Sequence, residues 1–257
     1  MPENDILLQD LHNGVLTLQL NRPKVNAFNF ELITTLQRAF KQAERDSQVR
    51  VVLLSGTGGV FSAGQDINEF TRSGVSYRNH LLRTYNPLVL QIRRLEKPVL
   101  AAVNGAVSGA ALGIVLACDL RLASEQARFV VGFAGIGLAP DSAVSLLLPA
   151  LIGLGRASEF TFSNASITAE QALAWGLVNR LAPASELMAV ASALAAGLAS
   201  GPSGAMGLAK RAFNKAVLAN LEQVLDYEAH LQEIAGSSAE HKEGVAAFLE
   251  KRPPKFN

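Results

Sequence analysis

The first regular pattern in the chain is a strand, a helix and a second strand. Apolar and polar residues alternate over Val15–Leu20, as in a half-buried strand, and turn residues at 21–23 end it. Apolar residues then recur at helical spacing from Leu32 to Phe40 and predict an amphipathic helix over residues 30–46. Val51–Leu54 is a short apolar strand. This order predicts a right-handed crossover between parallel strands.

The same order of elements is predicted again further along the chain. The segments are strands over residues 98–103, 119–123 and 129–131, and helices over residues 110–117 and 142–152. No sequence repeat of fixed period accompanies them, so the repetition lies in the architecture alone. Alternating strands and helices of this kind predict an α/β fold.

The chain changes character after Ser185. No strand pattern remains there, and predicted helices alternate with Gly, Ser and Pro breaks such as residues 200–202. We therefore expect an α/β core over residues 1–195 and a helical C-terminal region over residues 196–257.

Two pairs of residues have the spacing of a helix capping box. Thr168 and Gln171 precede one short helix, and Ser237 and Glu240 precede a last helix that runs to about Lys251. In each pair, the two side chains are expected to satisfy free backbone N–H groups at the helix start.

Composition narrows the class of protein without settling its chemistry. Hydrophobic residues make up 49% of the 257 residues and charged residues 18%. This apolar content fits either a well-filled α/β core or a core together with subunit interfaces. The net charge is +1 and no dense Lys/Arg cluster occurs, so no nucleic-acid partner is expected.

The cysteine, the histidines and the first residues bear on disulfide formation, metal binding and cellular location. Cys118 is the single cysteine, which excludes an internal disulfide, and its apolar surroundings indicate a buried, inert thiol. The four histidines show no metal-ligand spacing and are expected to be solvated. Glu3 and Asp5 precede any apolar stretch, and no apolar run reaches the roughly 18 residues of a membrane span. We expect a cytoplasmic protein with no metal and no membrane partner.

Two segments rich in small residues are candidates for ligand contact. Residues 61–67 follow the strand near Leu54, and small side chains there let the backbone approach a ligand closely. Residues 104–111 join a strand to a helix, whose free N–H groups suit an anion or a carbonyl oxygen that becomes one. An ordinary glycine-rich turn and close strand–helix packing are the respective alternatives.

Asp141 stands immediately before an apolar helical run. An aspartate at that place is a common helix N-cap, so the residue pattern by itself favours a capping role.

Together these segments resemble the crotonase superfamily, the enoyl-CoA hydratase/isomerase family. The resemblance extends along nearly the whole chain. It is carried by residues 21–23 with Asn26-Ala27, by 61–66, by 97–105, by Cys118-Asp119, by 127–129 and by 169–177.

The resemblance implies a spiral of ββα units, a helical trimerisation region, and trimers or hexamers built from paired trimers. It implies an acyl-CoA substrate and no separate cofactor, because coenzyme A is part of that substrate. The N–H groups of Gln65 and Ala110 are expected to form an oxyanion hole. The residues expected to meet the acyl-CoA are Ala63, Asp66, Ile67, Gly109, Gly113, Phe133, Tyr85, Asn86, Phe248 and Lys251. Of these, Phe248 and Lys251 match positions that reach the coenzyme A of a neighbouring subunit.

Departures from the family pattern bear on the reaction. Hydratases carry two glutamates, and at those positions this chain has Gly113 and Phe133, neither of which transfers a proton. Asp141 falls where dienoyl-CoA isomerases, 4-chlorobenzoyl-CoA dehalogenases and 1,2-epoxyphenylacetyl-CoA isomerases of the phenylacetate pathway keep an aspartate. The last group resembles this chain most. The dehalogenases' histidine and tryptophan correspond here to Asn86 and Phe133.

Three functional hypotheses follow. The first is an acyl-CoA isomerase in which Asp141 shuttles a proton, moving a double bond or opening a strained ring. The second is a water-adding enzyme, either a hydratase or a dehalogenase-like hydrolase. The third is a non-catalytic acyl-CoA binder.

Overall fold

The computed structural model describes residues 5–256, so Glu3 lies outside the described residues. Within them, one sheet has the order β1-β2-β3-β5-β7-β10 and a smaller one the order β4-β6-β8-β9. The strands are β1 (Leu7–His12), β2 (Val15–Leu20), β3 (Val51–Gly56), β4 (Val60–Ser62), β5 (Val99–Val103), β6 (Ala106–Ser108), β7 (Leu120–Ser124), β8 (Arg128–Val130), β9 (Ile167–Thr168) and β10 (Arg180–Ala182).

The larger sheet is parallel from β2 to β10, and only β1 joins it antiparallel, through the hairpin with β2. The central parallel strands β3 and β5 are buried on both faces, so they are apolar at successive positions. In β3, Val51 and Leu53 face one hydrophobic cluster, whereas Val52 and Leu54 face the other. The expected α/β architecture is confirmed.

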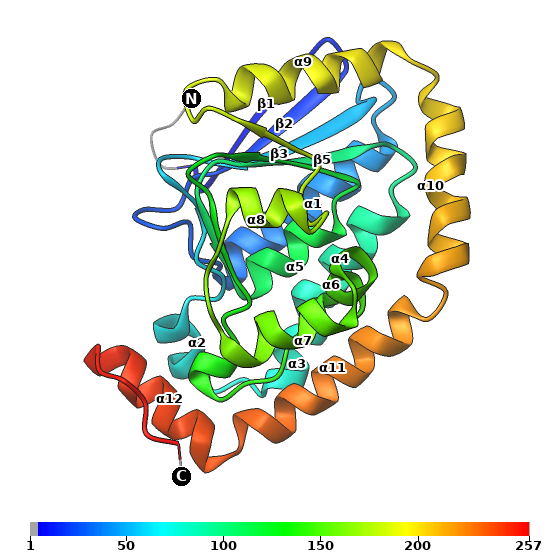
Figure 1. Cartoon of the computed structure of the whole chain (residues 1–257). Coiled ribbons are helices and arrows are strands. Elements are labelled where there is room, and N and C mark those ends of the chain that lie inside the picture. The colour runs from blue at the N-terminus through cyan, green and yellow to red at the C-terminus, as the bar shows by residue number, and fades with distance from the viewer. Residues whose placement is uncertain (1–4, 257) are drawn as a thin grey trace.

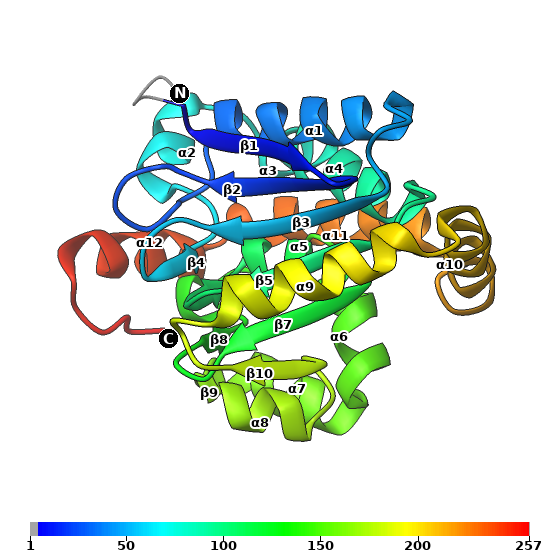
Figure 2. The same ribbon diagram turned by 90° about the horizontal axis from the view of Figure 1, so that it is seen from above.

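Helices cover both faces of the larger sheet (Figures 1 and 2). They are α1 (Phe30–Arg45), α2 (Ile67–Ser73), α3 (Tyr77–Arg83), α4 (Tyr85–Arg94), α5 (Ala110–Ala117), the 3-10 helix η1 (Ala134–Ile136), α6 (Val144–Ile152), α7 (Leu154–Ser163), α8 (Ala169–Ala174), α9 (Leu187–Ser200), α10 (Ser203–Val217), α11 (Leu221–Gly236) and α12 (Ala239–Glu250).

Helix α9 belongs to the sheet layer. Its buried residues Leu187, Ala191, Ala195 and Ala199 recur every four residues and pack on β2, β3, β5 and β7. Figure 2 shows the helix lying across the sheet. The boundary expected at residue 195 falls inside this helix, so the helices that stand apart from the sheet begin with α10.

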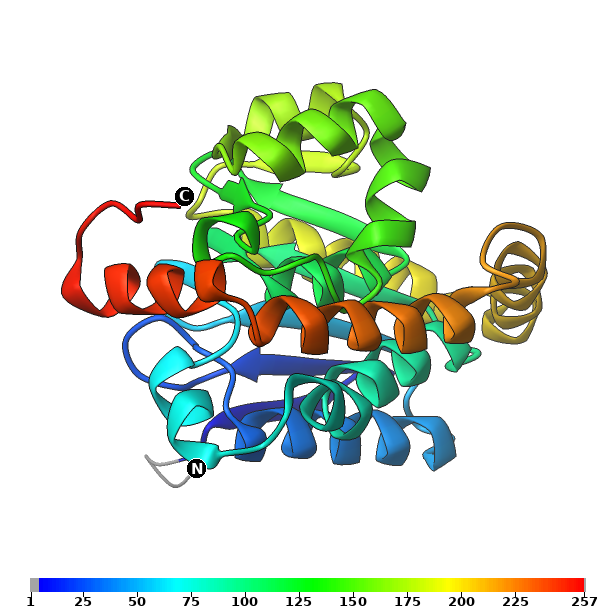
Figure 3. The ribbon, with the colours of Figure 1, turned by 90° about the horizontal axis from the view of Figure 1, so that it is seen from below.

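The last three helices form a frame around the core. Helix α10 stands at one side of the molecule in Figure 1, and α11 and α12 run across the underside in Figure 3. Helix α12 begins one residue later than its predicted capping box. Ser238 accepts the His241 N–H as N-cap, whereas the Ser237 hydroxyl donates to the carbonyl of Glu233 at the end of α11. The capping box at Thr168 and Gln171 is confirmed.

No single helix within residues 5–256 is both long and apolar enough to span a bilayer. Helices α9 and α10 reach that length and hydropathy only when taken together, across a bend of 102°.

Candidate active site

A cavity of about 740 Å³ opens at the carboxyl ends of three parallel strands of the smaller sheet. The segments that follow β4, β6 and β8 all line it, and α2, α3 and α12 complete its wall. The structure brings ten of the predicted site residues to this cavity: Asp141, Gln65, Ala110, Ala63, Asp66, Ile67, Gly109, Phe133, Tyr85 and Phe248.

Among the backbone N–H groups at the cavity, those of Gln65 and Ala110 have no protein acceptor within residues 5–256. Gln65 follows β4, and Ala110 is the first residue of α5. Gly64 brings their segments together, because a Cβ added there would lie 2.6 Å from the Ser108 carbonyl oxygen and 3.5 Å from the Ala110 nitrogen. Two free donors on adjacent segments, one at a helix N-terminus, suit an oxygen that gains negative charge.

The segment that carries Gln65 is fixed by short contacts on both sides. Phe28 pairs with it in an isolated parallel bridge. Asp66 then caps α2 by accepting the Glu69 N–H, and its other carboxylate oxygen lies 2.7 Å from the Arg22 guanidinium. The Asp66 carboxylate thus holds the loop that carries Gln65, and it acts at the cavity by fixing the position of that loop.

Asp141 faces the cavity from a buried position and is only 6% exposed. Its Oδ1 accepts a hydrogen bond of 2.7 Å from the Ser142 hydroxyl, and its Oδ2 accepts one of 2.7 Å from Gln232 Nε2. Burial raises the pKa of Asp141 to about 6, and the two hydrogen bonds to the carboxylate oppose that shift. A carboxylate with such a pKa is a far better base than an exposed aspartate.

Asp141 is not the N-cap that its position suggested, and α6 begins at Val144 rather than at Ser142. Ser142 and Ala143 both have left-handed backbones, with φ of 56° and 65°. The capping role falls to Glu228 of α11, whose carboxylate accepts the N–H groups of Ala143 at 2.8 Å and Ser145 at 3.0 Å. The Asp141 side chain is therefore free to face the cavity.

Left-handed backbone at a residue with a Cβ costs on the order of 1–3 kcal/mol and persists where the surroundings enforce it. Two such residues follow Asp141 in succession, so the surroundings must hold the turn over residues 141–145 in this conformation. We refer to residues 141–145 as the aspartate turn below.

Gly113 does not line the cavity but packs against the aspartate turn. A Cβ added at Gly113 would lie 2.5 Å from both the Cβ and the carbonyl oxygen of Ser142. The glycine at this position, where hydratases carry a glutamate, is thus what allows the turn to approach α5.

We expect Gly113→Ala to lower kcat about tenfold or more, because the added methyl group displaces Ser142 and with it Asp141. Gly→Ala in a helix otherwise favours folding by about 1 kcal/mol. Gly197→Ala in α9 is the matched control, since nothing lies within 4 Å of that position. Steady-state kinetics with melting curves measure both, and an unchanged kcat in Gly113→Ala would show that the turn tolerates the methyl group.

Two further predicted residues also lie away from the cavity. Asn86 is buried and its Nδ2 donates to the Leu225 carbonyl at 3.0 Å, so the side chain is directed toward α11. Lys251 ends α12 with a left-handed backbone and an exposed side chain. Phe248 lines the cavity of its own chain.

The expectation of solvated histidines is wrong for two of the four. His80 lies against the cavity, where its Nε2–H donates to Gln65 Oε1 at 2.7 Å and the Tyr85 hydroxyl donates to the same oxygen at 2.6 Å. Burial lowers the pKa of His80 to about 4, so the ring is neutral near pH 7. His241 donates from Nδ1 to the Ile136 carbonyl, which leaves Nε2 to accept from the Tyr77 hydroxyl.

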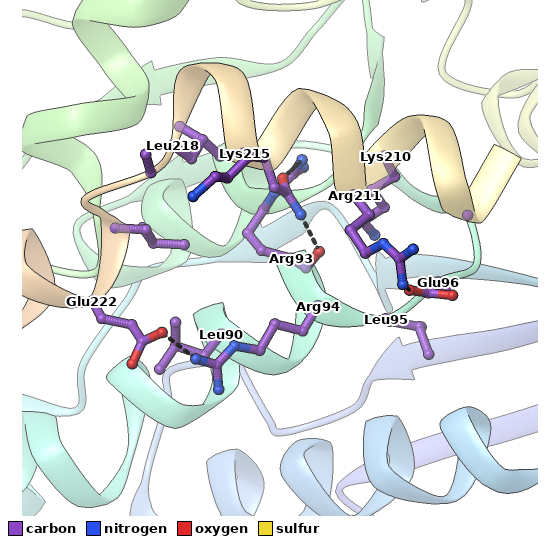
Figure 4. Close-up of a pocket in the computed structure, with 14 residues that line it drawn as sticks. Leu90, Arg93, Arg94, Leu95, Glu96, Lys210, Arg211, Lys215, Leu218 and Glu222 are labelled. Atoms are coloured by element: carbon purple, nitrogen blue, oxygen red, sulfur yellow. Dashed lines mark hydrogen bonds and ion pairs between the residues drawn. The ribbon is translucent and has the colours of Figure 1, made fainter.

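A second hollow, of about 310 Å³, lies between α4 and α10 and shares no lining residue with the cavity (Figure 4). Its charged side chains are largely paired within the chain. Arg94 pairs with Glu222 and Arg211 with Glu96, and Arg93 and Lys210 both contact Asp119. Within residues 5–256, no group of three or more His, Cys, Asp or Glu side chains is placed to hold a metal ion.

Comparison with known proteins identifies the family. The chain matches the enoyl-CoA hydratase/isomerase family model over residues 10–257. It is 40% identical over 257 residues to the 1,2-epoxyphenylacetyl-CoA isomerase of Escherichia coli strain K12, with 98% of each chain covered. It is 38% identical to a probable enoyl-CoA hydratase of Rhodobacter capsulatus, with 96% of each covered.

The crystal structure of an enoyl-CoA hydratase from Mycobacterium avium subsp. paratuberculosis K-10 has the same fold. The TM-score is 0.90 at 37% identity, and the match covers 98% of this chain and 99% of that one. The chain therefore belongs to the enoyl-CoA hydratase/isomerase family and has the crotonase fold. Because both isomerase and hydratase names occur among its relatives, the reaction has to be argued from the site.

Proposed function

We propose that this enzyme is an acyl-CoA isomerase in which Asp141 transfers a proton and the Gln65 and Ala110 N–H groups stabilise a thioester enolate. One observation carries the proposal: the buried Asp141 carboxylate shares a single cavity with the backbone N–H groups of Gln65 and Ala110, which have no acceptor among the described residues. The two positions at which hydratases carry glutamates hold Gly113 and Phe133, so Asp141 is the acidic side chain placed to act on the acyl group.

The reaction uses charge that develops on the thioester oxygen. That oxygen accepts hydrogen bonds from the two N–H groups, and Asp141 removes an α- or γ-proton to give the enolate. Each such donor contributes roughly 2.7–4 kcal/mol to lowering the barrier. Asp141 then returns the proton at a different carbon, which moves a double bond or accompanies opening of a strained ring.

The lining of the cavity supports an acyl-CoA ligand. Its lining includes Ala63 and Ile67 and the cationic residues Arg22 and Lys24, which suit the phosphates of coenzyme A. Tyr85 and Phe133 also line it and offer ring surfaces to the acyl group. The proposed reaction needs no further cofactor, because the coenzyme is part of the substrate. A trimer or hexamer and a cytoplasmic location complete the proposal.

The alternative reactions find less support in the geometry. A dehalogenase-like attack by Asp141 lacks its assisting group, since Asn86 at the matching position faces Leu225. Water addition lacks both glutamates. A non-catalytic binder would have no use for a strained turn that presents a buried carboxylate to the cavity.

The test is to incubate the enzyme separately with a trans-3-enoyl-CoA and a trans-2-enoyl-CoA while following absorbance and mass. We expect conversion of the 3-enoyl form to the conjugated 2-enoyl form without gain of water. Efficient water addition to the 2-enoyl form would identify a hydratase, and tight binding without turnover of any thioester would identify a binder.

The pH dependence of the reaction is fixed by the protonation state of Asp141. The base must be ionised to accept a proton, so kcat/KM is expected to fall as the pH is lowered through about 6. A pH–rate profile measures this limb on the free enzyme. A profile without a limb between about pH 5 and about pH 7 would mean that another group takes the proton.

A further inference from the structure

Helix α11 reaches the aspartate turn with two buried polar side chains, Glu228 and Gln232. They are four residues apart, so they lie on one face of the helix. Glu228 is 1% exposed and Gln232 is fully buried. Glu228 binds the backbone of the turn and the Ser145 hydroxyl, whereas Gln232 binds the carboxylate of Asp141 itself.

The contacts of Glu228 replace hydrogen bonds that the turn does not make by itself. Among the described residues, the N-cap Ala143 offers α6 no side-chain hydrogen bond. The N–H groups of Ala143 and of Ser145, in the first turn of α6, donate to Glu228 instead. A carboxylate offers acceptors only, and it accepts from both N–H groups at once. A glutamine there would place an NH₂ group against one of these donors and leave that donor unpaired.

Gln232 contributes differently. Its Nε2 donates to Asp141 Oδ2 at 2.7 Å, while its Oε1 is buried without a partner among the described residues. Leaving a buried amide oxygen unpaired is costly, so the orientation of the Gln232 amide needs a physical cause. Among the described residues, the hydrogen bond to Asp141 is what orients this amide.

Helix α11 is in turn held against α3 and α4, two helices that line the cavity. The Arg78 N–H donates to Glu233 at 2.9 Å, and Asn86 donates to the Leu225 carbonyl at 3.0 Å. Residues 78 and 86 neighbour Tyr77 and Tyr85, which line the cavity. One helix thus contacts both Asp141 and the helices that carry Tyr77 and Tyr85.

We propose that Glu228 and Gln232 are positioning residues for Asp141: Glu228 anchors the aspartate turn, and Gln232 orients the carboxylate and favours its ionised form. This inference rests on the proposed function, in which Asp141 transfers the proton. It assigns to the C-terminal helical region a role in the orientation of that group.

The experiment compares Gln232→Leu and Glu228→Gln with the wild-type enzyme on a trans-3-enoyl-CoA. We expect kcat to fall about 10²-fold in each, because a misplacement of about 1 Å costs this much, while KM stays within about twofold. In Gln232→Leu the acid limb of kcat/KM should also move to higher pH, since a hydrogen bond to the ionised carboxylate is lost. Gln223→Leu, at an exposed position of the same helix, is the control that should change nothing.

A double variant separates positioning from a general structural role. If Gln232 acts through Asp141, then Asp141→Asn/Gln232→Leu should be no slower than Asp141→Asn alone. An unchanged kcat and acid limb in Gln232→Leu, with Asp141→Asn inactive, would overturn the positioning role and leave the proposed function intact. Additive losses in the double variant would overturn it as well. Wild-type activity in Asp141→Asn would instead refute the proposed function itself.

Discussion

Replacing Asp141 with asparagine is expected to leave acyl-CoA binding intact and to lower the rate of isomerisation by roughly 10²–10⁴-fold, the usual contribution of a positioned acid–base group. Asparagine has nearly the same shape, and its amide oxygen can still accept the hydrogen bond from the Ser142 hydroxyl. It cannot take up a proton. Binding is measured by calorimetry with a saturated acyl-CoA, and turnover by the rise in absorbance of the conjugated product.

Asp10→Asn is the matched control for this substitution, because Asp10 is exposed on β1 and remote from the cavity. Both variants lose one negative charge, so a general electrostatic effect would appear in both. Turnover at the wild-type rate in Asp141→Asn would remove Asp141 from the reaction and with it the central part of this account.

Gly64→Ala is expected to lower kcat by about 10²–10³-fold, the effect of losing an oxyanion-hole donor. Gly64 has φ of 82°, and an added Cβ would lie 2.6 Å from the Ser108 carbonyl oxygen. The methyl group must push the Gln65 segment away from the Ala110 segment. The two N–H groups would then no longer converge on one oxygen.

Gly58→Ala separates this effect from backbone strain. Gly58 has a similar φ of 71°, but nothing lies within 4 Å of its added Cβ. Both variants should lose some stability in melting curves, whereas only Gly64→Ala should lose turnover. Equal kinetic losses in the two would attribute the effect to strain in the fold, and full activity in Gly64→Ala would place the oxyanion donors elsewhere.

The sequence predicted four of the six strands of the larger sheet, β2, β3, β5 and β7, and missed the edge strands β1 and β10. Val15–Leu20 alternates, and β3 and β5 contain the apolar runs Val51–Leu54 and Val99–Val103, since these strands are covered on both faces. The smaller sheet gave little such signal. Its strands β4 and β6 have three residues each, which is too short for a period to appear. The loops that form the oxyanion donors follow these strands, so they were found from small residues and from the family resemblance.

The environment of Asp141 could not be predicted from its neighbours in sequence. Local preference assigned it a capping role, whereas the cap comes from Glu228, far along the chain. A signal was nevertheless present in α11. Leu221, Leu225 and Ala229 mark the buried face of that helix, and Glu228 and Gln232 fall on it as polar residues. A buried carboxylate on an apolar helix face requires a partner, and here that partner is the aspartate turn.

The structure gives a physical reason for glycine at position 113. From the sequence it indicated only a missing glutamate. In the structure the same glycine allows Ser142 to pack against α5, which places Asp141 at the cavity. The absence of a side chain at Gly113 and the position of Asp141 are therefore linked through the close contact of Gly113 with Ser142.

The most direct test of the central claim is exchange of α-protons with solvent. Phenylacetyl-CoA has acidic α-protons, and its acyl chain has no alkene that could be moved or hydrated. Enolate formation can therefore be followed without a further reaction. The wild-type enzyme in deuterated buffer should replace these protons with deuterium, as followed by proton NMR and mass, and Asp141→Asn should not. Equal exchange in the wild-type enzyme and in Asp141→Asn would contradict proton transfer by Asp141 to and from an enolate.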